Sequence, residues 1–232
     1  MKSITCNIPD SLYEALQERM ESDKASCDHV VSVALSQCLG KPIHTLFQVS
    51  TSAALVEGLY QGAVRVSRLL RHGDFGLGTF IDLDGEMVVL DGICYQVSSS
   101  GAVGTVAGDR LIPYAVVTRF NAEFSKLSAN LIAAASGQEE FLFEEVEGTL
   151  VGLWSPGFAG SFSVPGYHFH FLSTDRQRGG HVLECKALDV SIEGCAMNEM
   201  HVSLPETEEF LKADLTRDPQ DDLVSAERNH ES

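Results

Sequence analysis

Short apolar runs separated by glycine and turn residues constrain the fold of this chain more than any other feature. From residue 46 onward, segments such as TFIDL, GEMVVL, ICYQVS, YAVVTRF, GTLVGLWS and GHVLECKALDV follow one another with turn signals between them. Many short strands at this spacing predict mixed or antiparallel sheets. Helical spacing is rarer and is expected over 52–62, 66–72 and 127–140. The sequence therefore predicts an α+β fold in which sheets dominate.

The first forty residues follow a different residue pattern. SITCNI (3–8) alternates like a strand, and PDSLYEALQERMES then switches to helical spacing. Ser26 or Asp28 is expected to cap a second helix, which ends at Gly40. Strand, helix, capped turn and helix in so short a span resemble the ribbon-helix-helix module, in which two chains pair their strands. We therefore divide the chain into a small module over 1–42 and a larger domain over 45–232.

Charge favours dimerisation over DNA binding for this module. In DNA-binding members of the ribbon-helix-helix family, the outward strand residues would correspond to Ser3, Thr5 and Asn7, and Lys2 is the one basic residue beside them. Phosphate contacts supply much of the affinity of such modules. The whole chain has a net charge of −17, which disfavours nucleic acid and anionic membranes as partners. A helical hairpin packed on the rest of the protein is the other interpretation.

The cysteines and the hydropathy pattern indicate a cytoplasmic location. The six cysteines are scattered, with no CxxC pair and no disulfide-framework spacing, which is typical of a reducing compartment. No run of eighteen apolar residues occurs, and the N-terminus lacks the apolar core of a signal peptide. We expect no membrane partner.

The stretch GYHFHF (166–171) carries the clearest chemical signal. In a strand, His168 and His170 point to the same face, about 7 Å apart at the backbone. The turn-rich STDRQRGG follows, so a hairpin would bring His181 beside them. Nitrogens bound to one tetrahedral zinc lie about 3.3 Å apart, a gap that side-chain rotation closes. Three neutral imidazoles with an open position are a common catalytic zinc arrangement, although HxH also arises by chance.

Several segments around these histidines resemble alpha-acetolactate decarboxylases. HGDFGLGTF, LDGEMVVLDG, PYAVVTRF, and GYHFHF followed by GGH occur in that family's order over most of residues 46–212. The resemblance implies a two-part α/β scaffold, usually dimeric. It also implies a zinc-dependent carboxy-lyase that converts 2-acetolactate to acetoin and carbon dioxide.

The resemblance also implies roles for individual residues. The family's zinc ligands fall on His168, His170 and His181. Its active-site glutamate and threonine fall on Glu86 of DGE and Thr79 of GLGTF. A second active-site glutamate from the C-terminal tail matches Glu227 in SAERN over a short alignment. The residues from 210 onward otherwise have the acidic, polar composition of a solvated tail.

The chain departs from the family between PYAVVTRF and GTLVG. Most of a long insert is missing there, including an arginine that is thought to bind the substrate carboxylate. Arg119 is the nearest substitute by position, and Arg176 or Arg178 in the hairpin are alternatives. Loss of a charged hydrogen bond of about 1.5–3 kcal/mol would lower turnover by roughly one to two powers of ten.

Three functional hypotheses remain open. The first is a zinc-dependent acetolactate decarboxylase with an N-terminal dimerisation module. The second is a non-catalytic protein that binds a hydroxy-keto acid and acts as a regulator through that module. The third is a decarboxylase-like enzyme that acts on a different keto acid.

Overall fold

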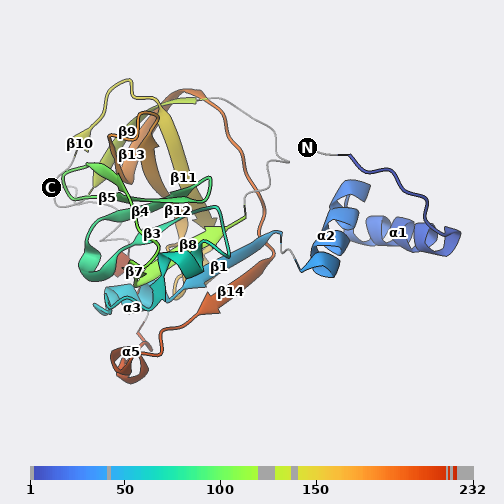
Figure 1. Ribbon diagram of the computed structural model, residues 1–232, viewed down its shortest axis with the longest axis horizontal. Helices are drawn as coiled ribbons and strands as arrows, with labels where there is room; N and C mark the ends of the chain where they lie inside the picture. The colour runs from blue at the N-terminus through green and yellow to red at the C-terminus, as the bar shows by residue number, and fades with distance from the viewer. Residues whose placement is uncertain are drawn as a thin grey trace.

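The computed structural model describes residues 3–40, 43–119, 129–136, 141–217, 219 and 222–223 of the chain. Two sheets form its body, and two helices lie to one side of them (Figure 1). The helices are α1 Asp10–Asp23, α2 Cys27–Leu39, α3 Ser52–Val56, α4 Val66–Leu69 and α5 Glu208–Lys212, with 3-10 turns η1 Ile81–Leu83 and η2 Gly157–Ala159. The prediction of an α+β fold with mixed sheets is confirmed.

The larger sheet has seven strands in the order β14-β1-β8-β3-β4-β5-β6. Their bounds are β1 Thr45–Val49, β3 Phe75–Thr79, β4 Glu86–Leu90, β5 Ile93–Val97, β6 Val103–Thr105, β8 Tyr114–Thr118 and β14 Glu199–Ser203. Strands β1 and β14 are parallel, and the other neighbours are antiparallel. A short pair, β2 Val64–Arg65 and β7 Leu111–Ile112, is separate from it.

The second sheet has five strands in the order β10-β9-β13-β12-β11, all antiparallel. Their bounds are β9 Ala129–Ser136, β10 Phe141–Leu142, β11 Gly148–Ser155, β12 Gly166–Ser173 and β13 Gly179–Val190. Strand β11 has the bounds of the predicted segment GTLVGLWS. The predicted hairpin of β12 and β13 is confirmed, with His170 opposite His181.

Strand periodicity explains how the two sheets meet. Along β4, Val88 packs with Val151 and Leu172 of the facing sheet, whereas Met87 and Val89 pack into a cluster on the other side. Side chains alternate between the two faces of a strand. Glu86 is therefore directed, like Val88, toward the five-stranded sheet.

One predicted helix is wrong. Helical spacing predicts a helix over 127–140, yet Ala129–Ser136 forms β9. This strand pairs antiparallel with β13 from Ala129 opposite Val190 to Ser136 opposite His181. Neighbouring strands that satisfy the backbone hydrogen bonds override a weak local helix propensity.

Other expected elements are shorter than predicted. The helices expected over 52–62 and 66–72 end at Val56 and Leu69. The strand expected over 79–83 is also wrong, because β3 ends at Thr79. Asp82 and Leu83 have φ of 55° and 53°, in the left-handed region, and this backbone cannot continue a strand.

Helix α2 begins and ends where the sequence predicted. The Ser26 hydroxyl accepts a hydrogen bond from the His29 N–H at 3.2 Å, and Gly40 closes α2 in the left-handed conformation. Residues 3–9 pair with no strand in the described part of the chain, so the predicted first strand stays a prediction. Neither α1 nor α2 contains a buried residue. No helix within the described ranges has both the length and the apolar character needed to span a membrane.

Candidate metal site and its cavity

Three histidine side chains converge from the adjacent strands β12 and β13. Their ligand nitrogens all lie within 4.8 Å of one another, and Nε2 of His168 is 3.2 Å from Nε2 of His170. That separation matches the roughly 3.3 Å expected between two nitrogens on one tetrahedral zinc. All three rings are buried, with His170 only 1% exposed. The donor set therefore fits a divalent cation in spacing and in chemistry.

The protein environment keeps His170 in the form that binds metals. Its Nδ1 lies 2.9 Å from the Met87 carbonyl oxygen, which can only accept, so Nδ1 carries the proton and Nε2 presents a lone pair. Burial, and then the neighbouring His168 and His181, hold the pKa of His170 well below its usual range, against a smaller opposite effect of the Met87 carbonyl. A neutral imidazole is the form that a cation requires.

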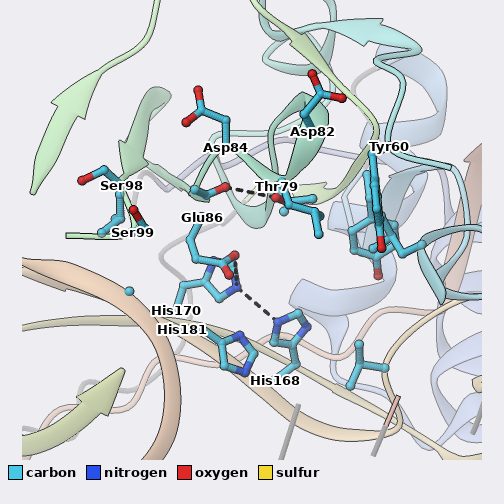
Figure 2. A pocket seen from close by; sticks show the side chains of 18 of the residues that line it. Tyr60, Thr79, Asp82, Asp84, Glu86, Ser98, Ser99, His168, His170 and His181 are labelled. Carbon is cyan, nitrogen blue, oxygen red and sulfur yellow. Dashed lines mark hydrogen bonds and ion pairs between the residues drawn. The ribbon is translucent and has the colours of Figure 1, made fainter. Parts of the chain in front are cut away.

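Glu86 reaches the histidines from the opposite sheet. Its Oε2 lies 3.3 Å from Nε2 of His170, and the carboxylate points toward the three rings (Figure 2). Thr79 is opposite Glu86 on β3, and its hydroxyl donates to the Gly85 carbonyl at 3.0 Å. The Thr79 hydroxyl thus fixes the turn that delivers Glu86.

Gly85 is required at this turn. Its φ is +85°, and a Cβ placed there would lie 2.2 Å from the Val97 carbonyl oxygen. Glycine tolerates both the left-handed backbone and the close approach. Gly85 therefore belongs to a tight turn that directly precedes Glu86.

A cavity of about 820 Å³ opens beside the histidines. Both sheets, the end of α3 and part of the C-terminal segment line it. Its polar and charged lining residues are Tyr60, Thr79, Asp82, Asp84, Glu86, Ser98, Ser99, Tyr114, His168, His170, His181, Arg217 and Asp222. The histidines therefore lie at the wall of a space large enough for a small organic molecule.

The structure brings together five of the residues singled out from the sequence and separates others from them. Thr79, Glu86 and the three histidines line the cavity. Arg119 lies outside its lining and donates to the Arg71 carbonyl at 2.7 Å. Glu227 lies outside the described residues.

The two arginines of the hairpin contact aromatic rings. The guanidinium of Arg176 lies 5.6 Å from the ring centre of Tyr95, and that of Arg178 lies 5.8 Å from the ring centre of Phe143. Neither arginine is in the cavity lining.

Sequence reasoning missed Arg217 and Tyr114. Tyr114 begins β8 and is 2% exposed, so it reads as a core aromatic. Arg217 lies in a stretch whose composition indicated a solvated tail, and no local signal marks it. Both line the cavity.

These features define a class of protein: a two-sheet α+β scaffold with a buried three-histidine group able to hold a metal, facing a carboxylate and a cavity. The sequence profile of alpha-acetolactate decarboxylases matches residues 46–130 and 123–217. The chain belongs to the alpha-acetolactate decarboxylase family.

Curated relatives cover most of this chain. It is 34% identical over 236 residues to the alpha-acetolactate decarboxylase of Methanosarcina mazei. The alignment covers 79% of this chain and 80% of that protein. It is 32% identical over 220 residues to the enzyme of Lactococcus lactis subsp. lactis, with coverage of 75% and 93%. The enzyme of Methylococcus capsulatus is 33% identical over 236 residues, with coverage of 82% and 91%.

A solved structure agrees in fold. The crystal structure of alpha-acetolactate decarboxylase from Bacillus subtilis strain 168 superposes with a TM-score of 0.68 at 26% identity. The superposition covers 80% of this chain and all of that one. The two-sheet body is therefore the family's fold.

Proposed function

We propose that this protein decarboxylates 2-acetolactate to acetoin and carbon dioxide, with Zn²⁺ held by His168, His170 and His181. One observation carries the proposal: three buried imidazoles and the Glu86 carboxylate meet at one wall of a cavity of about 820 Å³. Family membership supports the same reaction. A bound Zn²⁺ would supply Lewis-acid stabilisation of the negative charge that develops as carbon dioxide leaves.

The chain's own residues would orient the reaction and move a proton. The bond between the carboxylate carbon and its neighbour breaks, and the electron pair stays on that neighbouring carbon. Glu86, protonated from solvent, then gives its proton to that carbon, a step in which a positioned acid contributes about 100-fold to 10,000-fold. The Met87 carbonyl orients the His170 ring, and Thr79 holds the Gly85 turn.

Glu227 is proposed as a second acid at the same site. The proposal rests on the short match of SAERN to the family's tail glutamate. The chain does return to the cavity just before that point, since Leu223 is 4% exposed and lines it. Glu227→Gln tests this role through the stereochemistry of the acetoin formed.

The decisive experiment measures bound metal and acetoin in the same preparations. We expect about one Zn²⁺ per chain and acetoin formation from racemic acetolactate in the wild type, and loss of both in His168→Ala. His201→Ala is the matched control, because His201 lies on β14 and outside the cavity lining. Metal without acetoin would favour a sensor or a changed substrate, and absence of both would end the enzymatic interpretation.

We also propose that the N-terminal module makes the protein a homodimer. Apolar side chains on its segments are exposed, with Leu12 at 55%, Tyr13 at 52% and Leu35 at 45%. Helices of this length are marginal in water unless an apolar face is covered. Sedimentation of the full chain and of a chain lacking residues 1–40 tests this, and the same number of chains per particle in both would contradict it.

A cytoplasmic location remains part of the proposal. All six cysteines are unpaired, three of them exposed on the N-terminal module. Unpaired, exposed thiols are typical of a reducing compartment.

A further inference from the structure

We infer that Arg217 binds the carboxylate of the substrate, which would make it a specificity-determining residue of the decarboxylase. This inference rests on the proposed function, because it takes acetolactate as the occupant of the cavity. It assigns a role to a residue of the C-terminal segment that neither the sequence motifs nor the histidine site implies.

Within the described part of the chain, the cavity wall carries several acidic residues and one arginine. Four acidic residues line the cavity, and Arg217 is the single arginine or lysine among the lining residues that the structure describes. One acid, Asp84, is already paired with Arg110. An anionic substrate that enters such a cavity gains from a positive group on its wall, in addition to the proposed cation at the histidines.

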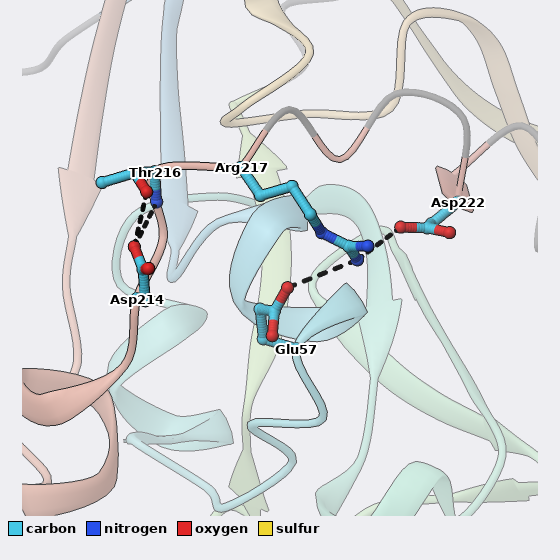
Figure 3. Close-up of polar contacts among 5 residues, drawn as sticks. All are labelled: Glu57, Asp214, Thr216, Arg217 and Asp222. Atoms are coloured by element: carbon cyan, nitrogen blue, oxygen red, sulfur yellow. Dashed lines mark hydrogen bonds and ion pairs between the residues drawn. The ribbon is translucent and has the colours of Figure 1, made fainter.

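Two carboxylates contact Arg217, one beside α3 and one in the same C-terminal segment. Its Nη2 lies 2.5 Å from Oδ2 of Asp222 and 3.4 Å from Oε1 of Glu57, the C-cap residue of α3 (Figure 3). Asp222 precedes the buried Leu223, which anchors this part of the chain against the body. The Arg217 side chain is 61% exposed, so these contacts limit its orientations in part before a ligand arrives and lower the entropic cost of binding to that extent.

The contacts leave part of the guanidinium able to donate. Both ion pairs use Nη2, and within the described residues neither Nε nor Nη1 has a hydrogen-bond partner. Arginine carries five N–H donors and remains charged at any physiological pH. A carboxylate in the cavity can accept from the remaining donors while Glu57 and Asp222 keep their contacts.

The other arginines considered for this role are engaged elsewhere. Arg119 donates to a backbone carbonyl outside the cavity lining. Arg176 and Arg178 lie near the rings of Tyr95 and Phe143. Of these four arginines, Arg217 is therefore the one that lines the cavity.

The test compares Arg217→Gln with Arg119→Gln in the zinc-loaded full chain. A charged hydrogen-bonded contact corresponds to about a 10-fold to 100-fold effect on binding. We expect Arg217→Gln to raise the KM for acetolactate by that factor and to leave kcat within about 3-fold. Arg119→Gln removes the same charge and should leave both constants unchanged.

Glu57→Gln distinguishes a binding role from a purely structural clamp. If Arg217 binds substrate, the closer contact with Asp222 keeps the guanidinium near its place in Glu57→Gln, and KM should change by less than about 3-fold. If Arg217 only ties the C-terminal segment to α3, Glu57→Gln should raise KM as Arg217→Gln does. Melting temperatures of all variants show whether the fold is retained.

A binding measurement supplies a readout independent of turnover. The probes are 2,3-dihydroxy-2-methylbutanoate, in which an alcohol replaces the ketone, and its neutral methyl ester. The wild type should prefer the acid, and Arg217→Gln should reduce that preference about 10-fold.

The outcomes separate the two proposals. Acetoin formation by the wild type, with an unchanged KM and an unchanged acid preference in Arg217→Gln, overturns the assignment of Arg217 alone. A raised KM in Arg119→Gln also overturns it, as does a KM in Glu57→Gln that rises as much as in Arg217→Gln. If the zinc-loaded wild type forms no acetoin, the proposed function fails and the Arg217 assignment fails with it.

Discussion

The N-terminal helices and the two-sheet body are stabilised in different ways. The body has continuous clusters in which Phe80, Leu77 and Phe171 are fully buried. Helices α1 and α2 contain no buried residue, although they carry apolar side chains such as Leu35. The body thus carries its own core, and the helices present a surface that a monomer does not cover. Chemistry is expected in the first region and association in the second.

The largest expected difference between the body and the N-terminal helices is in how a substitution changes kcat. Glu86→Gln should lower kcat by about 100-fold to 10,000-fold, because it removes the proposed proton donor. Zinc content, measured by atomic absorption, should remain at the wild-type level. Glu14→Gln makes the same change on α1 and should leave kcat as it is. A Glu86→Gln enzyme with wild-type kcat would remove this carboxylate from the mechanism.

The next largest difference between the body and the N-terminal helices is expected in the free energy of unfolding, when apolar residues are replaced by alanine. Phe171→Ala should lower the free energy of unfolding by about 3–5 kcal/mol, because it empties a fully buried site on β12. Leu35→Ala on α2 should change the unfolding of the body by less than about 1 kcal/mol. Urea titration of both variants measures these values. An equal cost for the two would show that α2 shares the core of the body after all.

Two glycines with positive φ offer a matched pair across the regions. Gly85→Ala should cost about 2–5 kcal/mol, since the left-handed backbone and the overlap with the Val97 carbonyl add. Gly40→Ala has the same kind of backbone but nothing within 4 Å of its Cβ. It should leave the melting temperature of the body unchanged. Thermal unfolding followed by circular dichroism compares the two variants.

The smallest effect is expected from removing the module itself. A chain lacking residues 1–40 should keep kcat and KM within about 2-fold, because no residue of α1 or α2 lines the cavity. Acetoin assays on the shortened and full chains make the comparison. A large loss of activity would show that dimerisation, or contact with the module, shapes the site.

Some of the fold was predictable because its signals are local. A strand turns alternate residues to the same face, so HxH in GYHFHF placed His168 and His170 together without knowledge of the rest of the chain. The glycine-rich STDRQRGG predicted the hairpin that adds His181. Ser26 and Gly40 marked the ends of α2 because capping depends on neighbouring residues. The resemblance to a known family supplied Glu86 and Thr79.

Other features depended on contacts between distant segments. The alanine-rich segment 127–140 reads as a helix, but β13 supplies the hydrogen bonds that make Ala129–Ser136 a strand. Arg217 reads as part of a solvated tail until Glu57 and Asp222 are seen beside it. Neither the strand at Ala129–Ser136 nor the ion pairs of Arg217 can be predicted from the neighbouring residues in the sequence.

The sequence by itself predicted the three-histidine group, since strand alternation and a hairpin connection depend on a few consecutive residues. Only the tertiary structure decided that the Glu86 carboxylate lies 3.3 Å from His170 and that an arginine from the C-terminal segment reaches the same cavity. The packing of one sheet against another and the return of a distant segment depend on the free energy of the whole fold. Periodicity within a segment carries no information about either.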